Sequence, residues 1–134
     1  MTLAYLATPY NHEKRPVMEN RKLAALDAAG RLLAAGQRVF SPIAHNVAII
    51  ETTGLEAGWG VWSEFDKDML SRCDLLIVLK LPGWEESLGV QAEIAEARRL
   101  GIPIQELAPE DLPPSRRPSR SSVEGRDNDT RSAH

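Results

Sequence analysis

The chain has a single cysteine, Cys73, among its 134 residues, so it cannot form an intramolecular disulfide. This composition is compatible with a reducing compartment. Cys73 stands where a helical pattern meets an apolar strand, which favours a buried structural thiol over a nucleophile. The three histidines, at positions 12, 45 and 134, are widely separated, so we expect no zinc site.

Long hydrophobic runs are also missing. No apolar stretch approaches the roughly 20 residues that a membrane-spanning helix needs, so we expect no membrane association. Residues 1–7 are apolar but lack a basic flank, which predicts a first strand rather than a signal peptide and favours a cytoplasmic protein. The net charge of -3 gives no basic surface for nucleic acid, although a local cluster of amides can still bind an anionic ligand.

Three common catalytic signatures are absent. The sequence holds no Gly-x-Gly-x-x-Gly turn, no Walker-type phosphate loop and no serine elbow of the hydrolase type. Dinucleotide oxidoreductases, P-loop NTPases and serine hydrolases are therefore disfavoured, and we expect no cofactor.

The residues present predict one α/β domain. Hydrophobic residues make up 43% of the chain, enough for a core. Apolar runs and helical periodicity predict strands at 3–7, 38–40, 74–79 and 102–104, and helices at 15–35, 42–50, 61–72 and 87–100. Glycines and threonines predict a mobile loop over 51–60.

Strands that alternate with helices indicate a mostly parallel sheet with right-handed crossovers over residues 1–112. Four strands are visible, and a fifth near 42–60 stays open. Pro103 predicts an edge position for the last strand. Ligands of such sheets bind beyond the carboxyl ends of the strands, so the loops 8–14, 41–46 and 80–89 should form the site.

Residues 113–134 differ sharply in composition from the rest of the chain. Val123 is their one large aliphatic residue, amid serine, arginine, proline and aspartate. Such a segment buries too little apolar surface to offset its ordering entropy, which predicts a disordered polar tail. Its arginines suggest nucleic acid, but Glu124, Asp127 and Asp129 dilute them and favour a solvated tail.

The start of the helix at 87–100 combines features of a ligand site. Ser87 predicts an N-cap, and the first helical turn offers backbone amides without partners inside the helix. Gly89 would let a ligand approach the backbone, and Glu93 lies one turn further along the same face. Spacing alone favours the alternative, in which Glu93 is a solvated helix residue that pairs with a nearby arginine.

Asp66 is the second acidic candidate. Helical spacing places it on one side with Trp62 and Met69, and the indole can line a pocket; the alternative is a surface carboxylate near Lys67. His45 and Asn46 follow the second strand and can orient a substrate hydroxyl or base, although a lone histidine is more often structural.

The order of these features resembles the nucleoside 2-deoxyribosyltransferase-like superfamily, in particular a small, functionally uncharacterised branch of it. The matching pieces cover residues 3–107. They are Tyr5-Leu6-Ala7-Thr8-Pro9-Tyr10, Ser41-Pro42, Asp66 eight residues before Asp74, Ser87-x-Gly89-x-x-x-Glu93 and Gly101-Ile102-Pro103-Ile104.

The resemblance implies a three-layer Rossmann-like sandwich with four or five strands, homo-oligomers, and cleavage of the bond between a nucleobase and its sugar. It implies that Glu93 is the nucleophile on the anomeric carbon and that Asp66 assists the base or the sugar. The expected substrate-binding residues are Tyr5, Thr8, Pro9, Tyr10, His45, Asn46, Trp62, Ser87 and Gly89. Trp59 and Trp84 are further candidates for stacking on the base.

The leading hypothesis is thus an N-glycosidase or deoxyribosyltransferase that acts on a nucleoside or a nucleoside 5′-monophosphate. A carboxylate can capture the oxocarbenium-like anomeric carbon while a second carboxyl group protonates the departing base. The alternative is a non-catalytic nucleotide-binding or sensing module on the same fold, because fold does not fix function. A third, weaker hypothesis is an interaction protein that acts through its tail.

Overall fold

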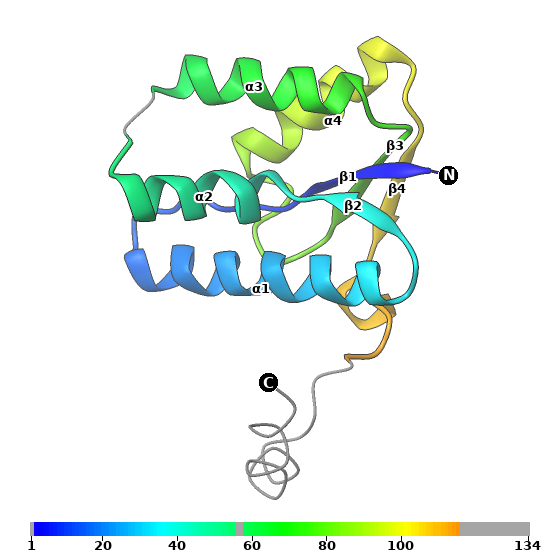
Figure 1. Ribbon diagram of the computed structural model, residues 1–134, viewed down its shortest axis with the longest axis horizontal. Coiled ribbons are helices and arrows are strands. Elements are labelled where there is room, and N and C mark those ends of the chain that lie inside the picture. Colours follow the sequence, from blue (N-terminus) through cyan, green and yellow to red (C-terminus); the bar gives the residue numbers. More distant parts are fainter. Residues whose placement is uncertain (1, 56–57, 116–134) are drawn as a thin grey trace, which may run out of the picture.

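The computed structural model describes residues 2–55 and 58–115, which form one parallel sheet between layers of helices (Figure 1). In chain order, the elements are β1 (Leu3–Ala7), α1 (Arg15–Ala34), β2 (Arg38–Phe40), α2 (Pro42–Thr53), α3 (Trp59–Ser71), β3 (Leu75–Leu79), α4 (Leu88–Leu100), β4 (Ile104–Leu107) and the short 3-10 helix η1 (Pro109–Asp111). The expected α/β class is confirmed.

The strand order of the sheet is β2-β1-β3-β4, with every neighbouring pair parallel. The described residues contain no fifth strand. The last strand lies at the edge, as Pro103 predicts, but it begins later than the expected 102–104. Its register explains the shift: Ile104 pairs with Leu76 and Leu107 pairs with Leu79, so the strand follows β3 to its end.

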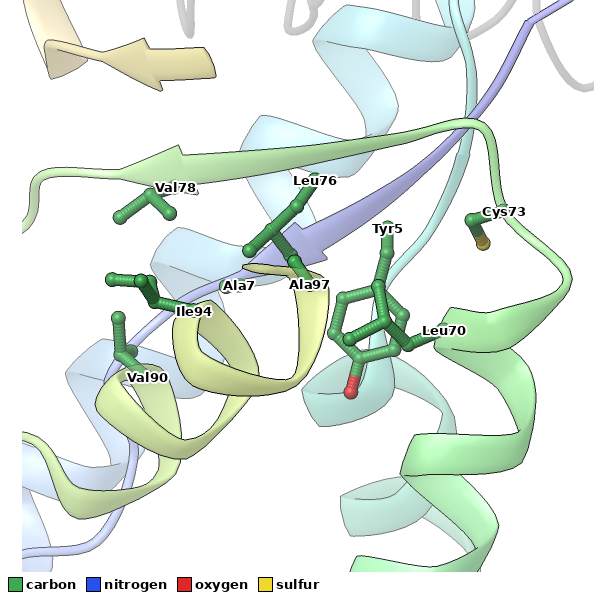
Figure 2. Packing of buried hydrophobic residues seen from close by; sticks show 9 residues of the cluster. All are labelled: Tyr5, Ala7, Leu70, Cys73, Leu76, Val78, Val90, Ile94 and Ala97. Carbon is green, nitrogen blue, oxygen red and sulfur yellow. The ribbon is translucent and has the colours of Figure 1, made fainter. Parts of the chain in front are cut away.

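Alternation along the strands divides the core between the two faces of the sheet. On one face, Ala4 and Leu6 of β1 pack with Ala28 and Leu32 of α1. On the other face, Tyr5 and Ala7 meet α3 and α4, and Figure 2 shows the Tyr5 ring beside Leu70, with its hydroxyl directed away from the strands. Cys73 is buried there and donates to the Met69 carbonyl at 3.3 Å, in keeping with a structural thiol.

Helix boundaries follow local capping groups. Ser41 Oγ accepts from the Ala44 amide at 3.1 Å, and α2 continues to Thr53, where Gly54 ends it with φ of 69°. The expected mobile loop over 51–60 is therefore wrong at both ends, because residues 51–53 belong to α2 and α3 begins at 59. Ser87 caps α4 through the Val90 amide at 3.2 Å, and Gly101 ends that helix as expected.

The chain beyond η1 remains attached to the domain as far as the structure describes it. Leu112 is buried in the core beneath α1, and Arg31 of α1 donates to the carbonyls of Leu112 and Pro113. Most of the expected disordered tail, residues 116–134, lies outside the described residues. Within residues 2–55 and 58–115, no helix has the length and apolarity required to cross a membrane.

Candidate active site

A cavity of about 700 Å³ opens where β1, β2 and β3 end. Its wall comes from the segments that follow these strands and from the facing sides of α2, α3 and α4. It is lined by Thr8, Tyr10, Asn11, Pro42, Ile43, Asn46, Val47, Ile50, Trp62, Ser63, Asp66, Lys67, Leu70, Glu86, Ser87, Leu88, Gly89, Ala92, Glu93 and Glu96. All three loops expected to form a site, 8–14, 41–46 and 80–89, contribute to this wall.

Glu93 reaches the cavity from the second turn of α4 and has a fixed partner beneath it. The hydroxyl of Tyr5 donates to Glu93 Oε2 at 2.5 Å, a length typical of a hydrogen bond to a carboxylate. Tyr5 lies on the central strand β1 and is fully buried. The bond therefore anchors one carboxylate oxygen to the most rigid part of the sheet and leaves Oε1 for a ligand.

Asp66 enters the same cavity from α3 and is held by an amide on α2. Asn46 is buried and its Nδ2 donates to Asp66 Oδ1 at 2.9 Å. The amide oxygen of Asn46 then faces His45 Nδ1 at 2.8 Å. Because that oxygen can only accept, His45 donates from Nδ1, and its ring stacks on Phe65 at 5.3 Å.

The two carboxyl groups share a setting that disfavours two negative charges. Burial raises the pKa of Glu93 to about 8; the Tyr5 hydrogen bond acts in the opposite direction, and the Asp66 charge raises it further. Burial also raises the pKa of Asp66, against the hydrogen bond from Asn46. Burial and the charge of Glu93 raise the pKa of Tyr5, so its hydroxyl stays a donor. A raised carboxyl pKa is the condition for donating a proton near neutral pH.

The remaining charged groups of the wall are mostly acidic. Glu86 and Glu96 join the two central carboxyl groups, and Lys67 is the one cationic side chain on the wall formed by the described residues. Glu96 is engaged in a two-point pair with Arg99 at 2.7 and 2.8 Å. In the part of the chain that the structure describes, no cluster of histidine, cysteine or carboxylate side chains is suited to a metal ion.

The structure brings most of the expected site residues to this one cavity. Those on its wall are Thr8, Tyr10, Asn46, Trp62, Asp66, Ser87, Gly89 and Glu93. Three expected residues do not line the cavity. Tyr5 and Pro9 are fully buried, and His45 is exposed to solvent. Tyr5 therefore meets the site through its hydroxyl alone.

The tryptophans differ in their position relative to the cavity. Trp62 lies on the cavity wall with its ring perpendicular to Phe65 at 6.2 Å. Trp84 packs against the core cluster of the α3 and α4 face, which does not suit a stacking platform. Met69 packs against the same cluster, so it does not share the cavity with Trp62 and Asp66 as its helical spacing predicted. The side chain of Trp59 lies outside what the structure describes.

Sequence reasoning missed the apolar wall that α2 provides. Ile43, Val47 and Ile50 line the same cavity as the carboxyl groups. Their spacing of four and three residues marks one helical face, and that signal was present in the sequence. The spacing alone does not distinguish a face packed on the core from a face open to a ligand.

Comparison with solved structures shows that the chain shares a Rossmann-like fold with an enzyme of known structure. It is similar to a 2-deoxyribosyltransferase from the psychrotolerant bacterium Bacillus psychrosaccharolyticus, with 20% sequence identity and a TM-score of 0.54, over 90% of this chain and 79% of that one. The fold expected from the resemblance is thereby confirmed.

A family model identifies the chain more closely. It matches residues 2–108, and the chain belongs to this family, which is described as a domain of unknown function, DUF1937. Comparison with curated proteins gave no match.

Proposed function

We propose that this protein cleaves the N-glycosidic bond of a nucleoside, with Glu93 as nucleophile and Asp66 assisting. The observation that carries the proposal is the convergence of both carboxyl groups on one cavity, with the Tyr5 hydroxyl bonded to Glu93 Oε2. A nucleoside transferase fold and the 2-deoxyribosyltransferase named above support it. Enzymes that cleave glycosidic bonds commonly use a pair of carboxyl groups, and here each carboxyl group has its own hydrogen-bond partner.

The first step forms a bond from Glu93 Oε1 to the anomeric carbon and breaks the bond from that carbon to the base nitrogen. The electron pair of the broken bond stays on the base, which takes a proton from Asp66. Water or a second base then attacks the anomeric carbon, displaces Glu93, and returns a proton to Asp66. The Asn46 amide orients Asp66 for this exchange.

The charge of the cavity favours an uncharged nucleoside over a nucleoside 5′-monophosphate. Among the lining residues, four carboxyl groups face one amine, that of Lys67. Glu86 lies beside the Ser87 cap, at the helix start that would otherwise attract a phosphate. We therefore expect the free nucleoside to be the better substrate.

The proposed roles set a direction for the pH dependence. Glu93 must be ionised to attack, and its pKa is raised to about 8. Because Asp66 must carry a proton for the same step, the rate of base release across about pH 5 to 9 should rise as Glu93 ionises and fall as Asp66 loses its proton, which gives a bell-shaped profile. Initial rates across this range, measured on a slow substrate so that chemistry limits them, give the profile.

A chromatographic assay tests the proposal. Purified protein is incubated with a panel of ribo- and deoxyribonucleosides and their 5′-monophosphates, and released base is quantified. Release by the wild type that is lost in Glu93→Gln supports the proposal. Glu96→Gln is the matched control, since Glu96 lies on the same helix and wall but is paired with Arg99. Equal release by wild type and Glu93→Gln rejects the assigned mechanism.

The same assay decides between hydrolysis and transfer when a second base is added, because a new nucleoside appears only in transfer.

The competing function is a binding or sensing module, which the raised Glu93 pKa favours, since a protonated carboxyl group is a poor nucleophile. It predicts ligand-dependent thermal stabilisation without turnover, retained in Glu93→Gln. The homo-oligomer and the cytoplasmic location stay predictions.

A further inference from the structure

We infer that Arg21 is a positioning residue of the cavity, which holds together the two loops that form its rim. Arg21 lies on α1, outside the lining residues, and its guanidinium reaches across to both loops. The inference rests on the proposed function where it concerns nucleoside affinity. Its structural part, the joining of the loops, stands independently.

The contacts of Arg21 are to backbone carbonyls on two separate segments. Nη1 donates to the carbonyl of Asn11 at 2.8 Å and to that of Tyr10 at 3.4 Å. Nη2 donates to the carbonyl of Pro82 at 3.3 Å. One planar side chain thereby bridges the loop after β1 and the loop after β3, which are more than 60 residues apart in the chain.

Both bridged segments lead directly to the cavity wall. Tyr10 and Asn11 line it themselves, and the loop after β3 continues into Glu86 and the Ser87 cap of α4. The carboxyl groups depend on other contacts, since Glu93 is held by Tyr5 and Asp66 by Asn46. Loss of Arg21 should therefore widen or loosen the rim without moving the reacting groups.

Gly83 shows that the loop after β3 is shaped around Arg21. Its φ is 90°, and a Cβ added there would overlap Arg21 Nη2. The backbone conformation favours a glycine, and the absence of a Cβ lets the guanidinium approach closely. Gly83→Ala should displace the guanidinium while leaving Arg21 in the chain.

The chain offers a matched control for each change. Gly36 has nearly the same φ, 92°, with open space around it, so Gly36→Ala reproduces the backbone strain without the contact. Arg31 lies on the same helix and also donates to backbone carbonyls, but those of Leu112 and Pro113, away from the cavity. Arg31→Met therefore controls for the loss of an arginine that joins α1 to another segment.

Hydrogen exchange tests the joining of the loops and needs no activity. In Arg21→Met and in Gly83→Ala, amides of residues 8–14 and 80–87 should exchange about tenfold faster, while those of β1 and β3 stay protected. The two control variants should leave both loops unchanged, and the double variant should add little to either change. Unchanged exchange in both loops, or faster exchange across the whole domain, overturns the inference.

Kinetics with the nucleoside that the wild type cleaves test the consequence. The KM of Arg21→Met should rise about tenfold with kcat nearly unchanged, because hydrogen bonds to a charged group at the rim are lost. Arg21→Lys should not restore the KM, since one ammonium cannot span both loops. A fall in kcat at constant KM contradicts a positioning role. If the wild type lacks turnover, the proposed function fails, and the exchange result still decides the role of Arg21.

Discussion

Leu6 and Tyr5 are neighbours on β1, yet they lie on opposite faces of the sheet and illustrate two uses of the same strand. On the α1 face, the buried cluster that includes Leu6 is entirely apolar. On the α3 and α4 face, Tyr5 adds a hydroxyl to an otherwise apolar cluster, and that hydroxyl meets Glu93 at the cavity. One face of the sheet thus serves stability, and the other combines packing with chemistry.

The largest expected effect is the loss of base release when Glu93, on the α3 and α4 face, is replaced. Glu93→Gln keeps an oxygen for the Tyr5 hydroxyl but removes the nucleophile, so kcat for base release should fall at least about 10³-fold. Base release quantified by chromatography checks this result, with circular dichroism to show that the variant is folded. Activity within a few-fold of wild type would contradict the comparison between the faces.

The opposite face should respond in stability alone. Leu6 is fully buried against α1, and Leu6→Ala should lower the free energy of unfolding by about 3 kcal/mol through lost burial and a residual cavity. Urea denaturation measures the change. The activity per folded molecule should stay near that of wild type, and a marked fall in kcat without loss of folded protein would show that the faces are not independent.

A pH series tests how the raised pKa of Glu93, on the α3 and α4 face, affects the stability of the fold. Glu93 binds its proton more tightly in the folded chain, with a pKa near 8 against an ordinary 4.5, so the free energy of unfolding should fall as pH rises between these values. Glu93→Gln removes this fall and should be more stable than wild type at pH 8 by about 2 kcal/mol. Parallel urea curves at pH 5 and pH 8 provide the measurement, and equal pH slopes would refute the raised pKa.

The smallest change concerns the Tyr5 hydroxyl. Tyr5→Phe retains the buried ring but removes the donor to Glu93, so kcat/KM should fall about tenfold, the scale of one hydrogen bond to a charged group. Because this bond lowers the pKa of Glu93, its loss should also move the rising limb of the pH profile to higher pH. A shift of that limb to lower pH would contradict the arrangement.

The fold was largely predictable because its strands are short apolar runs between clear caps. Ser87 and Gly101 defined α4 from the sequence alone, and the run ending in Leu79 defined β3. The end of α2 was not predicted, because Thr52 and Thr53 suggested a loop, although the left-handed Gly54 is a recognisable helix end.

The site was predictable to the extent that its groups follow strand ends or helix caps. Asp66 and Glu93 were found by spacing and resemblance, and both line the cavity. The role of Tyr5 as a buried donor was not found, because a strand tyrosine gives no sign of where its hydroxyl points. Arg21 was also missed, since an arginine on an amphipathic helix is ordinary and its partners are backbone carbonyls distant in sequence.

The most direct test of the central claim is mass spectrometry of the protein after rapid quenching during turnover of a nucleoside. We expect a pentosyl adduct on the peptide that carries Glu93, absent in Glu93→Gln and present in Glu96→Gln. Turnover with an adduct on another residue, or steady release of base without any adduct under conditions that trap glycosyl esters, would contradict the assignment of Glu93 as nucleophile.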